Sequence, residues 1–134
     1  MATNHAILYS NLIPVFADVD DSLCLNPYSV ESRITRNTKA VIYVGIGGNA
    51  ANYREIEKIC LQHGLTLIVD AAHMAGTRDN EGNHVGLNAD AVVFSFQAVK
   101  NLPTADSGLV SFKDLTAERV ARKLSWMGIN KNTA

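Results

Sequence analysis

Hydrophobic and polar residues follow one another along this chain in blocks that predict strands and helices in turn. Short, near-continuous apolar runs are typical of strands that lie inside a sheet and are covered on both faces. We predict five strands, at residues 13–19, 39–45, 65–70, 89–96 and 108–112. The first of them is entered through Pro14.

Three other segments repeat apolar residues at helical spacing, which predicts helices at residues 26–34, 51–64 and 115–128. The first has Asn26 as its cap and Pro27 at its first position, and Gly64 ends the second. The apolar face of the second helix consists of Tyr53, Ile56, Ile59 and Cys60. In the third helix we expect four residues to pack: Leu115, Val120, Leu124 and Met127.

Strands that alternate with helices predict an α/β fold, with a mostly parallel sheet and helices on both faces. The 134 residues are enough for one domain with a real core and too few for two. With 47% hydrophobic and 19% charged residues, the composition is that of a soluble globular protein. A Gly- and Asn-rich loop is expected at residues 76–88.

Charge and cysteine content remove several classes of function. A formal net charge of −1 gives no electrostatic case for binding nucleic acid or an anionic membrane. No apolar run approaches the ~18 residues of a membrane span, and the N-terminus lacks the pattern of a signal peptide, so we expect a cytoplasmic protein. Cys24 and Cys60 are distant and lie among apolar residues, which favours a reduced pair over a disulfide or a metal site.

Residues that carry chemistry follow two of the predicted strands. Asp70 closes the strand at 65–70, Ser95 falls near the end of the strand at 89–96, and Lys100 follows Ser95 by five residues. The carboxyl ends of parallel strands are where α/β proteins bind ligands. An amine for a Schiff base, a carboxylate for the pyridine nitrogen and a hydroxyl for the phosphate are the three groups that a pyridoxal phosphate site needs.

A glycine pattern offers an alternative. Gly45, Gly47 and Ala50 follow a predicted strand with the spacing of a relaxed dinucleotide-binding fingerprint, and Asp70 ends the next strand, where a ribose-binding acid is found. A Rossmann-like dinucleotide-binding protein is therefore the runner-up. The competing interpretation is that these glycines only allow a tight turn, and the nucleotide hypothesis leaves Ser95 and Lys100 without a role.

A second pattern, Asp18-x-Asp20-x-Ser22, resembles the nucleophile motif of phosphatases of the haloacid dehalogenase type. No late acidic pair follows to hold magnesium, so a polar turn is the better interpretation. The four histidines show no ligand spacing, and we predict no metal site. Only His73 is of interest, because it follows Asp70 by three residues.

At these positions the chain resembles the DegT family of sugar-nucleotide aminotransferases, which are pyridoxal phosphate (PLP) enzymes of fold type I. The resemblance covers the whole chain, and its clearest parts are IVDAAHMAGT, which matches the Asp-x-Ala-Gln/His strand end, and SFQAVK, which matches the Ser-Phe-x-x-x-Lys loop. It implies that Asp70 pairs with the pyridine nitrogen, Ala72 packs on the ring and His73 lies near the phenolic oxygen. It also implies that Ser95 binds the phosphate and Lys100 carries the Schiff base.

The resemblance implies amino transfer from glutamate or glutamine to a keto-sugar nucleotide, or to a keto-inositol, in polysaccharide biosynthesis. The parent enzyme is expected to be a homodimer. Residues 1–134 correspond to part of the PLP-binding large domain, without the N-terminal segment that carries the phosphate-binding turn and the stacking aromatic, and without the small C-terminal domain. Both ends look cut, so we expect a fragment with weak or no activity alone. A non-catalytic remnant or interaction module is the other alternative.

The segment VGIGGNAANY departs from the family pattern, which has a Val-His-x-x-Gly segment here. This departure leaves the substrate subgroup open.

Overall fold

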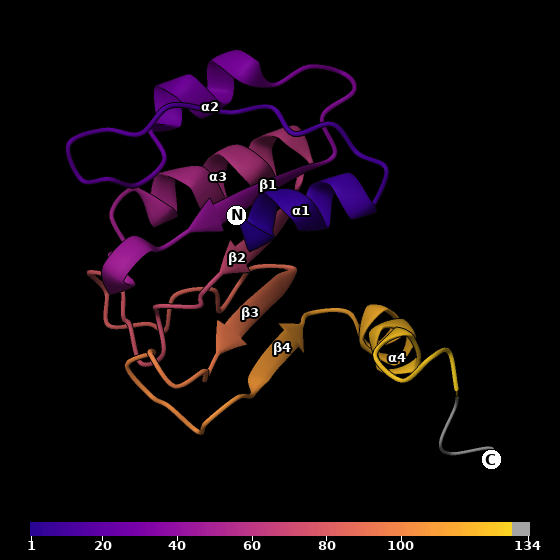
Figure 1. Ribbon diagram of the computed structural model, residues 1–134. Helices are drawn as coiled ribbons and strands as arrows, with labels where there is room; N and C mark the ends of the chain where they lie inside the picture. Colours follow the sequence, from indigo (N-terminus) through magenta and orange to yellow (C-terminus); the bar gives the residue numbers. More distant parts are fainter. Residues whose placement is uncertain (130–134) are drawn as a thin grey trace.

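A computed structural model describes residues 1–129 of the chain as a sheet with helices packed around it (Figure 1). The prediction that the chain ends at residues 131–134 without a stop signal lies outside the described residues. The elements are α1 (Ala2–Tyr9), α2 (Pro27–Arg33), β1 (Ala40–Val44), the short 3-10 turn η1 (Ile46–Gly48), α3 (Tyr53–His63), β2 (Thr66–Asp70), β3 (Ala91–Ser95), β4 (Gly108–Phe112) and α4 (Leu115–Leu124).

The four strands form one sheet in the order β1-β2-β3-β4. The pairs β1–β2 and β2–β3 are parallel, whereas β4 runs antiparallel to β3 at the edge. The predicted mostly parallel α/β fold is therefore confirmed, with one antiparallel strand added. Because β1, β2 and β3 share a direction, their carboxyl ends meet at one edge of the sheet.

Local signals explain where the helices begin and end. The Asn26 side chain accepts hydrogen bonds from the N–H groups of Tyr28 and Ser29, and Pro27 takes the first position of α2, as predicted. Helix α3 ends at Gly64, which adopts a left-handed conformation with φ of 61°.

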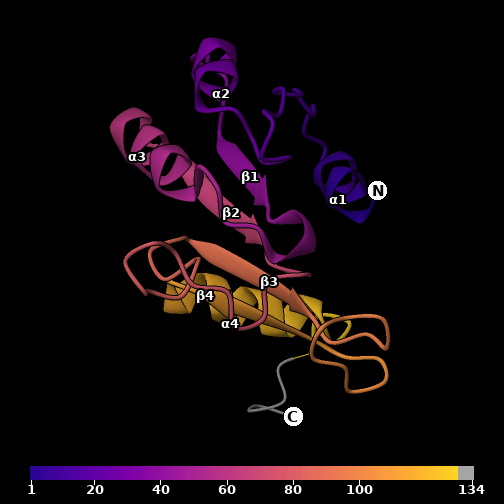
Figure 2. The same cartoon turned by 90° about the vertical axis from the view of Figure 1, so that its left-hand side faces the viewer.

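The core lies between α3 and one face of the sheet. Tyr43 of β1 and Val69 of β2 are completely buried, and the ring of Tyr43 meets the ring of Tyr53 edge to face at 5.4 Å. Figure 2 shows α3 on one side of β1 and β2 and α1 on the other, so helices cover both faces here. The apolar face predicted for α3 is confirmed, since Tyr53, Ile56, Ile59 and Cys60 are all buried.

The predicted strand at 13–19 is wrong. Only Val19 forms an isolated bridge, with Leu25, and Val15 and Phe16 are exposed. An apolar segment becomes a strand only when a neighbouring strand pairs with its N–H and C=O groups, and this segment instead runs along the outside of the molecule (Figure 1).

The last helix also differs from its prediction. Helix α4 ends at Leu124, because Met127 turns to a positive φ of 53° and Gly128 donates to the Lys123 carbonyl at 2.7 Å. The four residues expected to pack, Leu115, Val120, Leu124 and Met127, are 51–81% exposed. Helix α4 contacts β4, and no described element covers its apolar side. No helix within residues 1–129 is long and apolar enough to cross a bilayer.

Candidate functional site

The site predicted from the sequence lies at the sheet edge where the parallel strands end. Asp70 is the last residue of β2 and pairs with Val93 of β3, and Ser95 lies two residues further along β3. Side chains that pair across parallel strands share a face, and residues two apart on a strand do so as well. Asp70 and Ser95 therefore project from the same face, roughly 7 Å apart along the strand direction.

The Asp70 carboxylate is half-buried and held by two donors. Its Oδ2 accepts a hydrogen bond from the Thr3 hydroxyl of α1 at 2.7 Å, and its Oδ1 accepts the N–H of Ala72 at 3.2 Å. Ala71 continues the ladder by donating its N–H to the Val93 carbonyl at 2.8 Å. The carboxylate is thus fixed in orientation, while each oxygen keeps the capacity to accept a further hydrogen bond.

The turn after Asp70 places His73 against η1. The N–H of Gly47 donates to Nδ1 of His73 at 3.2 Å, and the histidine side of this turn is exposed to solvent. Ala72 is half-buried between Asp70 and His73.

The loop after β3 carries Lys100 and is bound to the same turn. The Asn101 side-chain amide donates to the Ala75 carbonyl at 2.8 Å, so the residue next to Lys100 contacts the segment that holds His73. The backbone folds locally as well, because the N–H of Lys100 donates to the Gln97 carbonyl at 2.9 Å. Lys100 is half-buried, and its amine has no hydrogen bond or ion pair within residues 1–129.

Ser95 keeps its hydroxyl proton available. Its Oγ accepts the N–H of Gln97 at 3.5 Å, which leaves the O–H free to donate. The structure thus brings Asp70, Ala72 and His73 together on one turn, with Ser95 at the end of the adjacent strand and the Lys100 loop bound to that turn.

Three contacts at this site were not predicted from the sequence. Thr3, Gly47 and Asn101 each contact the segment 70–75 from far away in the chain. Thr3 and Asp70 are 67 residues apart, and no local pattern indicates a pairing at that distance. Asn101 and Ala75 are 26 residues apart, so the sequence shows a loop amide beside the candidate lysine but does not indicate its partner.

The glycine segment does not present the open N–H groups that a dinucleotide phosphate needs. The N–H of Gly47 is used by His73, and those of Gly48 and Asn49 donate to the carbonyls of Gly45 and Ile46. Helix α3 begins only at Tyr53, after a left-handed Asn52. This geometry favours the interpretation that the glycines allow a tight turn.

The acidic pair near the N-terminus is part of a polar turn. Asp20 accepts hydrogen bonds from Ser22 and from the Asn52 side chain, the latter at 2.6 Å. These hydrogen bonds, first those of the Ser22 hydroxyl and Asn52, lower the pKa of Asp20. Asn49 adds a second link by donating to the Ser22 carbonyl at 2.7 Å. The turn therefore anchors the segment around η1.

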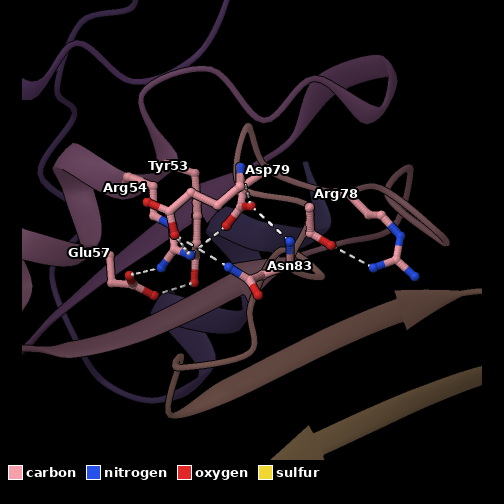
Figure 3. A network of polar contacts seen from close by, with 8 residues as sticks. Tyr53, Arg54, Glu57, Arg78, Asp79 and Asn83 are labelled. Carbon is pink, nitrogen blue, oxygen red and sulfur yellow. Dashed lines mark hydrogen bonds and ion pairs between the residues drawn. The ribbon is translucent and has the colours of Figure 1, made fainter.

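A network around Arg54 fixes the loop at 76–88 onto α3 (Figure 3). The Arg54 guanidinium contacts Glu57 at 2.7 Å, Asp79 at 2.7 Å and Glu81 at 3.1 Å. Burial opposes the charge on Asp79, but the N–H groups of Asn83 and Glu81 and the Arg54 charge outweigh it and lower its pKa. The network thus attaches Asp79 and Glu81 to α3, in the loop that comes shortly after His73 in the chain.

Cys24 and Cys60 are both free thiols in the structure, and both are buried. Burial raises the pKa of the Cys60 thiol to about 11, with smaller contributions from Asp90 and Glu57. Within the described part of the chain, no group of three or more His, Cys, Asp or Glu side chains is arranged to hold a metal ion.

Comparison with known proteins gives one consistent result. The profile of the DegT/DnrJ/EryC1/StrS aminotransferase family matches residues 1–134. The chain is 35% identical to the spore coat polysaccharide biosynthesis protein SpsC of Bacillus subtilis over 131 aligned residues. The aligned region covers 97% of this chain and 33% of SpsC.

Solved structures agree in fold. PseC of Helicobacter pylori, an aminotransferase of pseudoaminic acid biosynthesis, superposes with a TM-score of 0.90 and 30% identity over 97% of this chain and 35% of PseC. DesI, solved in the presence of its TDP-sugar product, superposes with a TM-score of 0.85 and 35% identity over 99% of this chain and 34% of DesI. The chain thus spans about a third of the length of these relatives.

Proposed function

The chain belongs to the DegT/DnrJ/EryC1/StrS aminotransferase family, and we propose that it forms the part of a PLP-dependent aminotransferase that holds the Schiff-base lysine. The proposed reaction transfers an amino group from glutamate or glutamine to a keto-sugar nucleotide, or to a keto-inositol. SpsC, PseC and DesI support a sugar acceptor by their names, since each is linked to polysaccharide, pseudoaminic acid or TDP-sugar chemistry.

One observation carries this proposal. Asp70 and Ser95 lie on one face at the ends of adjacent parallel strands, and the loop with Lys100 is bound through Asn101 to the turn that follows Asp70. A carboxylate and a hydroxyl donor thereby lie at one sheet edge, and the loop that carries Lys100 is attached to the turn beside them. Neither a dinucleotide site nor a phosphatase site uses this set.

The donor set fits PLP in its chemistry. The Asp70 carboxylate can accept a further hydrogen bond, the Ser95 hydroxyl is free to donate, and the Lys100 amine has no partner in the described chain. When bound, the cofactor supplies an aldehyde for amines and a ring that withdraws electrons from a substrate Cα.

Each residue then has a proposed task. Asp70 holds the proton on the pyridine nitrogen, which keeps the ring electron-withdrawing. Ser95 donates to the phosphate, Ala72 packs against the ring and His73 contacts the phenolic oxygen. Lys100 would hold the cofactor through its amine and, once the substrate amine has displaced it, would move the proton at the substrate Cα.

We propose that the 134-residue chain alone turns over weakly or not at all, because it spans about a third of its relatives' length. We further propose that the enzyme to which these residues contribute is a cytoplasmic homodimer that acts on small-molecule substrates. Size-exclusion chromatography of this chain beside a full-length relative tests the dimer, and turnover with glutamate by the pure chain contradicts the proposed loss of activity.

Cofactor trapping tests the site itself. The chain is incubated with PLP, reduced with borohydride and mapped by mass spectrometry. We expect a single labelled lysine, Lys100, and loss of the label in Lys100→Ala, while the exposed control Lys58→Ala keeps it. Label spread over many lysines, or none, contradicts the proposal and favours a non-catalytic remnant or interaction module.

A further inference from the structure

His73 accepts a backbone hydrogen bond on one ring nitrogen, and this bond determines which of its two nitrogens carries the proton. The N–H of Gly47 donates to Nδ1 at 3.2 Å, so Nδ1 is the acceptor nitrogen. In a neutral imidazole one nitrogen accepts and the other carries the proton. The proton of neutral His73 therefore lies on Nε2, on the opposite side of the ring from Gly47.

We propose that Gly47 is a positioning residue that holds His73 as the Nε2–H tautomer, so that the ring offers a neutral N–H donor to an anionic oxygen of the bound ligand. The inference rests on the proposed function, in which that oxygen is the phenolic oxygen of the cofactor. Gly47 is one of the glycines that resembled a dinucleotide-binding fingerprint, and the proposal gives it a different role, that of orienting His73.

The backbone around Gly47 is built for this contact. Gly47 has φ of +60°, a left-handed conformation that favours glycine, and no atom lies near the place where a Cβ would be. The glycine is thus required for its backbone direction rather than for space.

The neighbouring residues lock η1 onto the turn that bears His73. A Cβ on Gly48 would lie 3.0 Å from the His73 carbonyl oxygen, and the Thr77 hydroxyl donates to the Gly48 carbonyl at 3.2 Å. Directly after η1 in the chain, the Asn49 side-chain amide donates to the Ser22 carbonyl at 2.7 Å. The segment that carries the donor of the His73 hydrogen bond is therefore attached to two other parts of the chain, at Thr77 and at Ser22.

The other ring nitrogen is left for a ligand. Nε2 of His73 has no hydrogen-bond or ion-pair partner within residues 1–129, and the residue is exposed at the edge where Asp70 ends its strand. A neutral donor there can bind an anionic oxygen without adding a positive charge beside the Asp70 carboxylate.

Nitrogen NMR of the chain without cofactor tests the tautomer directly. Long-range ¹H–¹⁵N spectra of the ¹⁵N-labelled protein in alkaline buffer distinguish protonated from unprotonated ring nitrogens, and His73→Gln identifies the His73 signals. We expect one tautomer for His73, with the proton on Nε2. His84, an exposed loop histidine whose ring has no hydrogen bond in the described chain, is the internal comparison and should show both tautomers.

Two variants test the cause and the consequence. Gly48→Ala should push η1 away and give His73 a mixture of tautomers like that of His84. His73→Gln keeps an acceptor for Gly47 and an N–H donor for the ligand, so its PLP dissociation constant should stay within about threefold of the parent. His73→Leu has neither group and should bind PLP about tenfold or more weakly.

The outcomes separate this inference from the proposed function. A proton on Nδ1, or a mixture in the unaltered chain, overturns the inference whatever the cofactor does. If His73→Gln binds PLP as poorly as His73→Leu, the donor role is overturned even with the expected tautomer. If the unaltered chain binds no PLP, the proposed function fails, while the NMR result still decides whether Gly47 sets the tautomer.

Discussion

Gly45 and Met74 occupy complementary space: a Cβ on Gly45 would overlap the Met74 side chain, whose sulfur is the nearest atom. Both residues are buried: Gly45 directly follows β1, and Met74 lies on the turn after β2. The thioether therefore fills the volume that a larger residue at position 45 would need.

We expect Gly45→Ala to destabilise the chain by about 1–3 kcal/mol, which is the usual cost of overpacking a core. Met74→Ala should remove the clash, so the double variant should be more stable than the sum of the two single effects predicts. Urea unfolding of the four proteins measures this coupling. Additive effects would show that the two side chains do not share space.

Thr3 should control the Asp70 carboxylate from α1. Thr3→Val removes the 2.7 Å hydrogen bond at nearly constant volume, and we expect PLP to bind about five- to tenfold more weakly because the carboxylate is less well oriented. Thr3→Ser keeps the hydroxyl and should bind like the parent. Absorbance titration with PLP measures both, and equal affinities for the Val and Ser variants would exclude this role.

Asp79 should make the chain sensitive to acid. Its pKa is lowered in the folded state, so the unfolded state binds more protons and stability falls with falling pH. The contribution is complete above the ordinary Asp value of ~3.9 and is lost as the pH drops through the lowered folded value.

Asp79→Asn should therefore flatten the decline of unfolding free energy below about pH 4. Asp21→Asn is the matched control, because Asp21 is exposed and has no hydrogen bond or ion pair in the described chain. Chemical denaturation at several pH values compares the three proteins. Identical slopes for the parent and Asp79→Asn would mean that the Arg54 network does not carry the acid response.

The cysteines should react only on unfolding. Cys24 and Cys60 are 1% and 3% exposed, and the pKa of Cys60 is raised to about 11, so at pH 8 this thiol is almost entirely protonated as well as covered. A disulfide reagent that releases a coloured thiolate should label neither residue in native buffer and both in urea. Rapid labelling of the folded chain would contradict the burial of this region.

Local patterns predicted most of the fold. The cap at Asn26, the stop at Gly64 and the apolar face of α3 are short-range signals, and all three are found in the structure. The strand predicted at 13–19 failed because pairing depends on a neighbour that the segment itself does not reveal. For α4 the spacing indicated an apolar face correctly, but only the tertiary structure determines whether anything covers it.

In the candidate site, too, local features could be predicted from the sequence and long-range contacts could not. Asp70, Ser95 and Lys100 could be selected because their positions relative to strand ends are local features. The contacts that hold them, from Thr3 and Asn101, link distant segments through single side chains and have no periodic signature. The Gly47 contact with His73 was hidden for another reason, since the donor is a backbone N–H that any residue possesses.

Asn101 should determine how well Lys100 reaches the cofactor. Its amide donates to the Ala75 carbonyl at 2.8 Å, and this bond attaches the lysine loop to the turn that follows Asp70. Asn101→Ala removes the attachment without touching Lys100, so we expect borohydride trapping at Lys100 to slow about five- to tenfold at limiting PLP, a loss equivalent to about one hydrogen bond. Asn101→Gln, which can still donate, should recover part of the rate.

Asn80→Ala is the matched control, because it also removes a side-chain amide from a loop. The Asn80 side chain is exposed and has no hydrogen bond in the described chain. Trapping should proceed there at the parental rate. If Asn101→Ala traps as fast as the control, the loop keeps Lys100 in place by its own backbone bonds, such as the one from the Lys100 N–H to Gln97, and the side-chain attachment is dispensable.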